Sequence, residues 1–335
     1  MSNYKFFVCL IMGLFLIFAT ISLVGGETKI SMKLWNRYTY ETSGGEVNAS
    51  EIALKRGYFR IEPKLTDKID GRFNLDFYSE ANALNAAGLR VKYAYLNFAE
   101  VLPIPESKIS VGLIQHYFGF GYDWAYITIE KVLEEVEGVA TSADYGIAFC
   151  GNIPGDKGVY SISVLNGEGY TRTGRDLDNI PEFLGNLRIA PVGAITLGGS
   201  LLYEKDDSDR LAYIALGRLD GGIFELWGEY LVRSMNDVTS NGFMVMSIIK
   251  LRELTNIDAD IIGRFDMWDI NNSVDNDSHM RIIAGLNWNI LRDANNIPQT
   301  MLQIQAQREI FESNVDDIDR LMVQLQWGFS NTFVQ

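Results

Sequence analysis

The feature that most constrains this chain is a two-residue alternation in which one face of a segment is apolar and the other carries amides. The clearest case lies within residues 299–311, where Leu302, Ile304 and Ala306 alternate with Gln303, Gln305 and Gln307. Successive side chains of a strand point to opposite faces. Amides buried without partners in a soluble core would each cost several kcal/mol. The pattern therefore predicts strands whose apolar face meets lipid and whose amide face meets a water-filled lumen.

The same alternation recurs along the chain and predicts an all-β fold, a transmembrane antiparallel β-barrel of about 16 strands. The expected strands are 28–41, 50–65, 71–80, 88–102, 108–118, 142–151, 158–166, 183–190, 194–205, 211–219, 223–234, 241–252, 259–270, 279–291, 299–311 and 319–333. The two longest connections between them, 119–141 and 167–182, both follow odd-numbered strands. Long loops at one end and short turns at the other are typical of outer-membrane barrels.

The amino-terminal segment predicts export. Residues 1–26 contain Lys5, an apolar run and two small residues, Gly25 and Gly26, which together indicate a cleaved signal peptide. The alternative is a retained transmembrane anchor, because the run is long enough to span a bilayer. Residues 27–335 then form the barrel, and Cys150 is their one cysteine, so no internal disulfide is expected. The net charge of −14 argues against a nucleic-acid partner.

Residues 118–139 are the longest interval that does not read as strand or tight turn. After a glycine-rich and aromatic opening, they show a short helical pattern with one apolar side. Four acids crowd the rest of that pattern: Glu130, Glu134, Glu135 and Glu137. We expect this third external loop to fold inward and form the pore constriction. The alternative is an acidic external lid that never enters the lumen.

Cations on the polar faces of the second to fourth predicted strands are the candidate pore wall: Arg56, Arg60, Lys64, Arg72, Arg90 and Lys92. Rows of opposite charge on wall and loop would set up a transverse field that orients dipolar solutes. The alternative is that these cations pair with wall carboxylates and only keep the surface solvated. Because basic wall and acidic loop would oppose each other, we expect a weak ion preference.

Other chemistry has little support in the sequence. The two histidines, His116 and His279, fit no nucleophile or metal-ligand pattern, so we expect no enzyme and no cofactor. Loop acids in two clusters are candidates for Ca²⁺, although solvated acids are the default interpretation. The clusters are Asp269, Asp275 and Asp277, and Asp316, Asp317 and Asp319.

Large aromatic residues are candidates for the girdles that mark the two membrane interfaces. They are Trp35, Tyr38, Tyr40, Trp268, Trp288 and Trp327. Trp227 and Trp268 fall on the inferred lumen face, where they would either line a solute path or pack within the wall, and wall packing is the default.

Several segments resemble strands of the phosphate-selective porin O and P family of Gram-negative bacteria. They are LKRGYFRIEPKLTDKIDGRFNLDF, LRVKYAYLNF, KISVGLIQHYFG, VLNGEGY and ELWGEYLV, in matching order over most of the chain. The resemblance implies a sixteen-stranded outer-membrane channel, usually trimeric, with a third loop folded inward. Gln115, His116 and Tyr117 replace the family's Lys/Thr/Pro stretch, and no dense lysine ladder is present. From the resemblance we therefore expect the family's architecture and passive uptake, but not its phosphate selectivity.

Together these patterns predict a porin of the bacterial outer membrane, a passive diffusion channel for small hydrophilic or ionic solutes. Its expected partners are outer-membrane lipid, lipopolysaccharide and two further copies of itself in a homotrimer. The alternative is a structural or adhesin-type barrel without an open pore.

Overall fold

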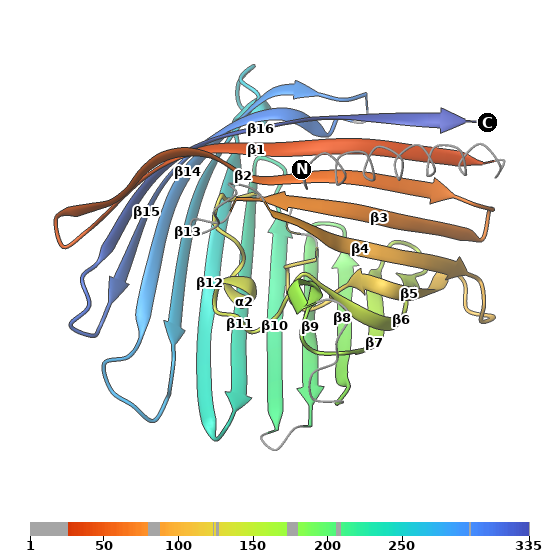
Figure 1. Cartoon of the computed structure of the whole chain (residues 1–335), viewed down its shortest axis with the longest axis horizontal. Coiled ribbons are helices and arrows are strands. Elements are labelled where there is room, and N and C mark those ends of the chain that lie inside the picture. Colours follow the sequence, from red (N-terminus) through yellow and green to blue (C-terminus); the bar gives the residue numbers. More distant parts are fainter. Residues whose placement is uncertain are drawn as a thin grey trace, which may run out of the picture.

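In the computed structural model, sixteen antiparallel strands form one closed barrel (Figure 1). The structure describes residues 26–79, 88–122, 124, 127–172, 180–205, 209–294 and 296–334. The strands are β1 (Glu27–Ser43), β2 (Glu46–Lys64), β3 (Ile69–Tyr78), β4 (Gly88–Ala99), β5 (Ser107–Gln115), β6 (Ala143–Ile153), β7 (Gly158–Leu165), β8 (Glu182–Val192), β9 (Ile195–Glu204), β10 (Arg210–Asp220), β11 (Phe224–Met235), β12 (Val238–Lys250), β13 (Ala259–Asp269), β14 (His279–Arg292), β15 (Pro298–Phe311) and β16 (Ile318–Val334). The predicted fold class and strand number are confirmed.

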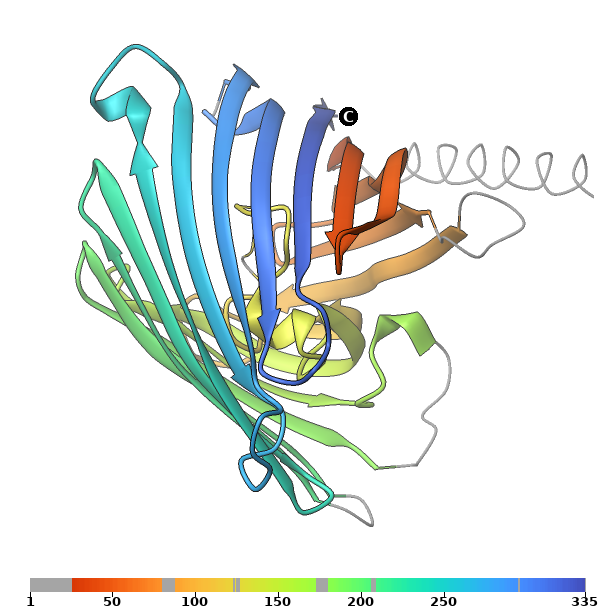
Figure 2. The same ribbon diagram turned by 90° about the vertical axis from the view of Figure 1, so that its left-hand side faces the viewer.

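Closure comes from the pairing of the first and last strands. β1 and β16 are antiparallel over their whole length, from the pair Glu27 and Val334 to the pair Ser43 and Ile318. Every other strand pairs with its neighbours in sequence, so no strand edge is left open. Figure 2 shows the strands from a second direction, inclined around the common interior.

The two faces of the wall are inverted relative to a soluble protein. On β15, Gln303, Gln305 and Gln307 are buried while Ile304 is 39% exposed. On β16, Gln324 and Gln326 are buried while Leu321, Leu325 and Trp327 are exposed. The amides lie inside and the apolar side chains outside, which is the arrangement that a lipid-embedded wall requires.

The buried amides bond to one another and to neighbouring side chains. Gln324 donates to Gln303 at 2.7 Å, Gln303 donates to Asn287 at 3.1 Å, and Trp35 donates to Gln326 at 2.9 Å. Since each bond offsets the desolvation of a polar group, this part of the inner face is stabilised by protein partners. The expectation that these amides contact only lumen water was too simple.

Several element boundaries differ from those predicted. β2 begins at Glu46, since Gly44 and Gly45 turn the chain with φ of +58° and +85°, values that suit glycine. β5 ends at Gln115 rather than at residue 118. The predicted helical pattern yields only α2 (Leu133–Val136), while η1 (Tyr170–Arg172) and η2 (Leu251–Glu253) are single turns. None of the helices in the described ranges has the length and apolarity needed to cross a membrane.

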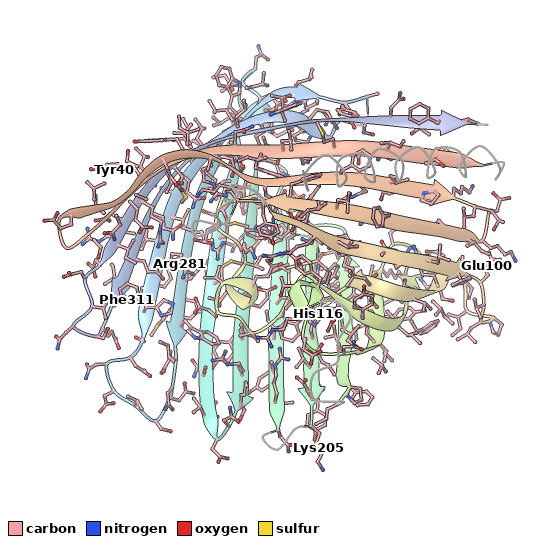
Figure 3. All side chains as sticks on the ribbon, in the orientation of Figure 1. Tyr40, Glu100, His116, Lys205, Arg281 and Phe311 are labelled. Atoms are coloured by element: carbon pink, nitrogen blue, oxygen red, sulfur yellow. The ribbon has the colours of Figure 1, made fainter. Side chains whose placement is uncertain are left out.

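The connections β5–β6 and β7–β8 both follow odd-numbered strands, so they lie at the same end of the barrel. Figure 3 shows Tyr40 and Phe311 toward one end and Glu100 at the other. The predicted signal segment, residues 1–26, lies outside the described residues except for Gly26.

Two of the six girdle candidates are not girdle residues. Trp35 and Trp268 are each only 2% exposed and belong to the inner face, and for Trp268 this agrees with the lumen-face placement expected from the sequence. The reason is strand parity, because Trp35 shares a face with Lys33 and Arg37. Tyr40, Trp288 and Trp327 are exposed on the barrel surface, as girdle residues would be.

Candidate functional site

The segment between β5 and β6 packs its apolar side against one half of the inner wall. Phe118, Phe120, Val132 and Leu133 are at most 1% exposed and belong to one buried cluster. The wall residues of that cluster come from β5 to β13 and include Leu184, Leu202, Ile214, Leu231, Met244 and Ile262. Burial of apolar area at this contact holds the segment against the strands.

Polar wall residues also hold the backbone of this segment. Asn287 donates to the carbonyl of Ile127 at 2.8 Å, and the amide of Ile129 donates to the side chain of Gln305 at 2.8 Å. Arg264 donates to the carbonyl of Lys131 at 2.6 Å. A segment with little regular structure has many unpaired backbone groups, and β13, β14 and β15 satisfy several of them.

Glu137 is bound to His279 and Arg281 of β14. Its carboxylate lies 3.1 Å from Nε2 of His279 and 3.3 Å from Arg281. Arg281 also contacts Asp266 at 3.0 Å and Glu309 at 2.9 Å, so one guanidinium joins loop, β13 and β15. Charge-assisted bonds of this kind are stronger than neutral ones.

Glu130 faces the same part of the wall. It accepts from Gln307 at 3.3 Å, and its other oxygen accepts from the amide of Lys131 at 3.0 Å. Burial by itself would raise the pKa of Glu130, but the positive charges of Arg281 and Arg264 together with these hydrogen bonds hold it below its ordinary value.

Glu134 is buried beside Glu229 of β11, which is buried as well. Its carboxylate accepts a hydrogen bond from the amide of Gly121 at 2.8 Å. Desolvation by burial raises the pKa of Glu134 to about 7, and the charge of Glu135 acts in the same direction. Gly119 has φ of +57°, and a Cβ there would lie 2.2 Å from the Glu134 carboxylate, so a side chain at this position is excluded.

Glu135 is the one member of the predicted acidic set that borders an open cavity, where it pairs with Lys131 at 3.0 Å. The cavity has a volume of about 410 Å³ and lies between this segment and β1 to β4. Its charged lining residues are Lys29, Lys33, Arg56, Arg60, Arg72, Lys92 and Lys131, and Glu62, Glu135 and Asp293. Its aromatic lining residues are Trp35, Tyr58, Tyr93, Tyr122, Trp124 and Phe329.

Of the six predicted wall cations, Arg56, Arg60, Arg72 and Lys92 converge on this cavity. Lys64 is 52% exposed and pairs with Asp67 at 2.9 Å at the end of β2. Arg90 is stacked over the ring of Tyr78, 3.7 Å from its centroid, and is not among the lining residues. Four of the six predicted wall cations therefore border the cavity, and Lys64 and Arg90 do not.

The cavity cations differ in their partners. Arg72 pairs with Glu62 at 2.6 Å, and Arg56 lies 3.3 Å from Asp76. Lys92 donates to the hydroxyl of Tyr58 at 2.9 Å. Arg60 donates to the amide oxygen of Asn74 at 3.2 Å, a neutral acceptor.

The sequence interpretation missed Lys29 and Lys33 as lining residues. The alternation of β1 places them on one face with Trp35, and this parity was available in residues 28–41. It also missed Arg264 and Arg281. Their role depends on which strands lie next to the inserted segment, and that information is not local in sequence.

Among the described residues, no group of three or more His, Cys, Asp or Glu side chains is arranged to hold a metal ion. Asp317 and Asp319, which were calcium candidates, lie 2.9 Å and 3.7 Å from Arg308. His116 pairs with Glu182 at 2.8 Å in the buried wall.

Comparison with solved structures identifies the fold. OmpF of Salmonella typhi, solved in complex with daunomycin, matches with a TM-score of 0.64 and 11% identity over 90% of this chain and 98% of that one. The anion-selective porin from Comamonas acidovorans matches with a TM-score of 0.62 and 12% identity, covering 91% and 100%. The outer membrane protein OpdK from Pseudomonas aeruginosa gives 0.57 and 11%, covering 91% and 99%.

These similar structures are outer-membrane porins of Gram-negative bacteria, and identities this low establish the shared fold alone. No protein-family profile matches the chain, and no curated protein matches it either. The specific resemblance to phosphate-selective porins is not confirmed.

Proposed function

We propose that this protein is a porin of the outer membrane that lets small hydrophilic or ionic solutes diffuse passively. The observation that carries the proposal is the inverted wall, in which amides and charges such as Gln305 and Arg60 face the interior while Ile304 and Leu321 face outward. Such a wall is stable in lipid and leaves a polar path through it.

Further properties of a porin are part of the proposal. They are export through the cleaved segment 1–26, contact with lipopolysaccharide, assembly as a homotrimer, and the absence of catalysis or a bound cofactor. The porin fold supports them, and the phosphate-selective variant of this function remains the weaker alternative because Gln115, His116 and Tyr117 depart from that family's pattern.

Reconstitution in a planar bilayer tests the function. We expect stepwise current increases of uniform size as single barrels insert. A folded protein that inserts without any current would overturn the channel and favour the alternative, a structural or adhesin-type barrel with a closed lumen.

We propose that the β5–β6 segment lies inside the lumen and narrows it. The hydrogen bonds from Asn287, Gln305 and Arg264 to its backbone support this, because all three side chains belong to the inner face. In both directions of view α2 is drawn within the outline of the barrel (Figures 1 and 2).

Replacement of residues 127–137 by a short Gly/Ser linker tests this placement. We expect the single-channel conductance to rise, because the linker removes volume from the narrowest part of the path. A matched control shortens the β13–β14 connection, residues 271–277, and should leave conductance unchanged. Equal conductance of the loop variant and the parent would place the segment outside the lumen.

A further inference from the structure

The cavity between β1–β4 and the inserted segment carries an excess of positive charge. Seven cations and three carboxylates line it, which leaves an excess of four positive charges. Asp76, buried behind Arg56, offsets one of these. An excess of like charge in a confined space raises the local concentration of anions.

These cations include three that have no carboxylate within ion-pair distance. Among the described residues, none of Lys29, Lys33 and Arg60 has a carboxylate oxygen within 4.0 Å. Lys33 is repelled by Arg60 and attracted, less strongly, by Asp293, and Arg60 is in turn repelled by Arg72. Adjacent cations that lack an anion between them are unfavourable unless a mobile anion visits the space.

The loop acids do not fill this space. Glu137 contacts Arg281 and His279, and Glu130 accepts a hydrogen bond from Gln307. Glu134 lies beside Glu229. Only Glu135 borders the cavity, and Lys131 lies beside it. Of the four loop acids expected to oppose the basic wall, Glu135 is therefore the one that borders this cavity.

From this geometry we infer that the cavity is a binding station for small organic dicarboxylates, which it selects over cations and over monoanions. This inference rests on the proposed channel function. Lys33 and Arg60 supply two neighbouring positive charges with no carboxylate of the described residues within 4.0 Å, although Asp293 and Glu62 attract them from farther away. Two such charges match two carboxylates, and guanidinium groups bind carboxylates through paired hydrogen bonds. The ring-rich lining, with Tyr58, Tyr93 and Tyr122, suits a carbon skeleton better than a fully hydrated inorganic ion.

Bilayer recordings with succinate as the probe test the station. In a KCl gradient the reversal potential should show chloride permeating several-fold better than potassium. Succinate should interrupt the current at lower concentration than acetate or sulfate, by about tenfold. Current interruption by sulfate as strong as that by succinate would overturn the choice of an organic dicarboxylate.

Variants assign these effects to the cavity. Lys33→Gln with Arg60→Gln should lower the chloride preference about threefold or more and abolish the interruption by succinate. Arg60→Lys should retain the chloride preference, because the charge remains. Lys64→Gln is the matched control, because Lys64 is exposed and outside the cavity. A double variant that behaves like the parent would overturn the inference.

A protein that inserts without conducting current would refute the proposed channel. Binding of succinate to the cavity would then be tested by calorimetry. Titration of succinate into the detergent-solubilised protein should then release heat that the Lys33→Gln, Arg60→Gln variant does not show. Absence of heat with the parent protein would end the inference independently of conductance.

Discussion

Glu134 and Glu229 are neighbouring buried carboxyl groups, and such a pair favours a proton on one of them. Oε1 of Glu134 accepts from the amide of Gly121, whereas Oε2 of Glu134 and both oxygens of Glu229 are buried without a hydrogen-bond partner among the described residues. An ionised carboxylate can only accept, so the contact is satisfied when one of the two carries the proton. Arg264 and Asp266 act on Glu229 with opposite signs, and Glu135 acts on Glu134.

This pair makes the attachment of the loop depend on pH. The pKa of Glu134 is raised from an ordinary 4.5 to about 7 when the segment is docked. Docking is therefore strongest below pH 4.5, weakens as the pH rises, and stays at its lowest level above about 7, with a total change of about 3 kcal/mol. We expect current fluctuations in the open channel to become more frequent between pH 4.5 and 7.

Substitutions isolate the origin of this dependence. Glu134→Gln keeps a donor for Glu229 at every pH and should flatten the profile. Glu135→Gln should keep a pH-dependent profile but move it to lower pH, because the charge of Glu135 helps to raise the pKa of Glu134. A Glu134→Gln variant with an unchanged pH profile would show that the pair does not control docking.

At the level of elements, the β5–β6 segment is held by two different kinds of contact. Apolar residues attach it to β5–β13, and hydrogen bonds attach it to β13, β14 and β15. Arg281 is the strongest single link of the second kind, because it contacts Glu137, Asp266 and Glu309 together.

Removal of Arg281 should therefore loosen the segment. Arg281→Gln leaves three carboxylates without their shared cation, and breaking a buried network of this kind costs about 3–5 kcal/mol. We expect a lower unfolding temperature and noisier open-channel current. Arg308→Gln, which removes a cation that is 54% exposed, should change stability by less than about 1 kcal/mol. Equal effects of the two substitutions would contradict this role.

The strands could be predicted from the sequence because each depends on a local two-residue alternation. The wall residues that contact the β5–β6 segment could not be predicted in this way. The alternation of Gln303 to Gln307 identifies a strand and its inner face without any tertiary information. The contact of Glu137 with Arg281 joins positions 144 residues apart and depends on the path of an irregular segment. The expectation that loop acids face wall cations across open space fits Glu135. The other three acids contact wall residues that their spacing in the sequence does not reveal.

At the scale of the whole molecule, side chains alternate between the inner and the outer face on every strand. The inner face nevertheless differs in composition between the two sides of the barrel. From β8 to β13 the inner face includes Leu202, Ile214 and Met244, which are buried against the segment. From β1 to β4 it carries Lys33, Arg56, Arg60 and Lys92, which border open space. The outer face is apolar on both halves. The cavity that this basic side borders is therefore the open space next to the β5–β6 segment.

The outer face gives the most direct test of the membrane-embedded barrel. Leu187 is 52% exposed at the middle of β8, and Val192 is 56% exposed at its end. In lipid, Leu187→Arg should lower the free energy of unfolding by about 2–4 kcal/mol, while Val192→Arg should cost about 0–1 kcal/mol, since the penalty of a charge falls from the midplane to the interface. Reversible unfolding by urea from liposomes measures both. In water, two similarly exposed positions would tolerate arginine equally well. Equal and small losses in the free energy of unfolding would therefore mean that this face does not contact hydrocarbon. The proposed membrane channel would then lose its physical basis.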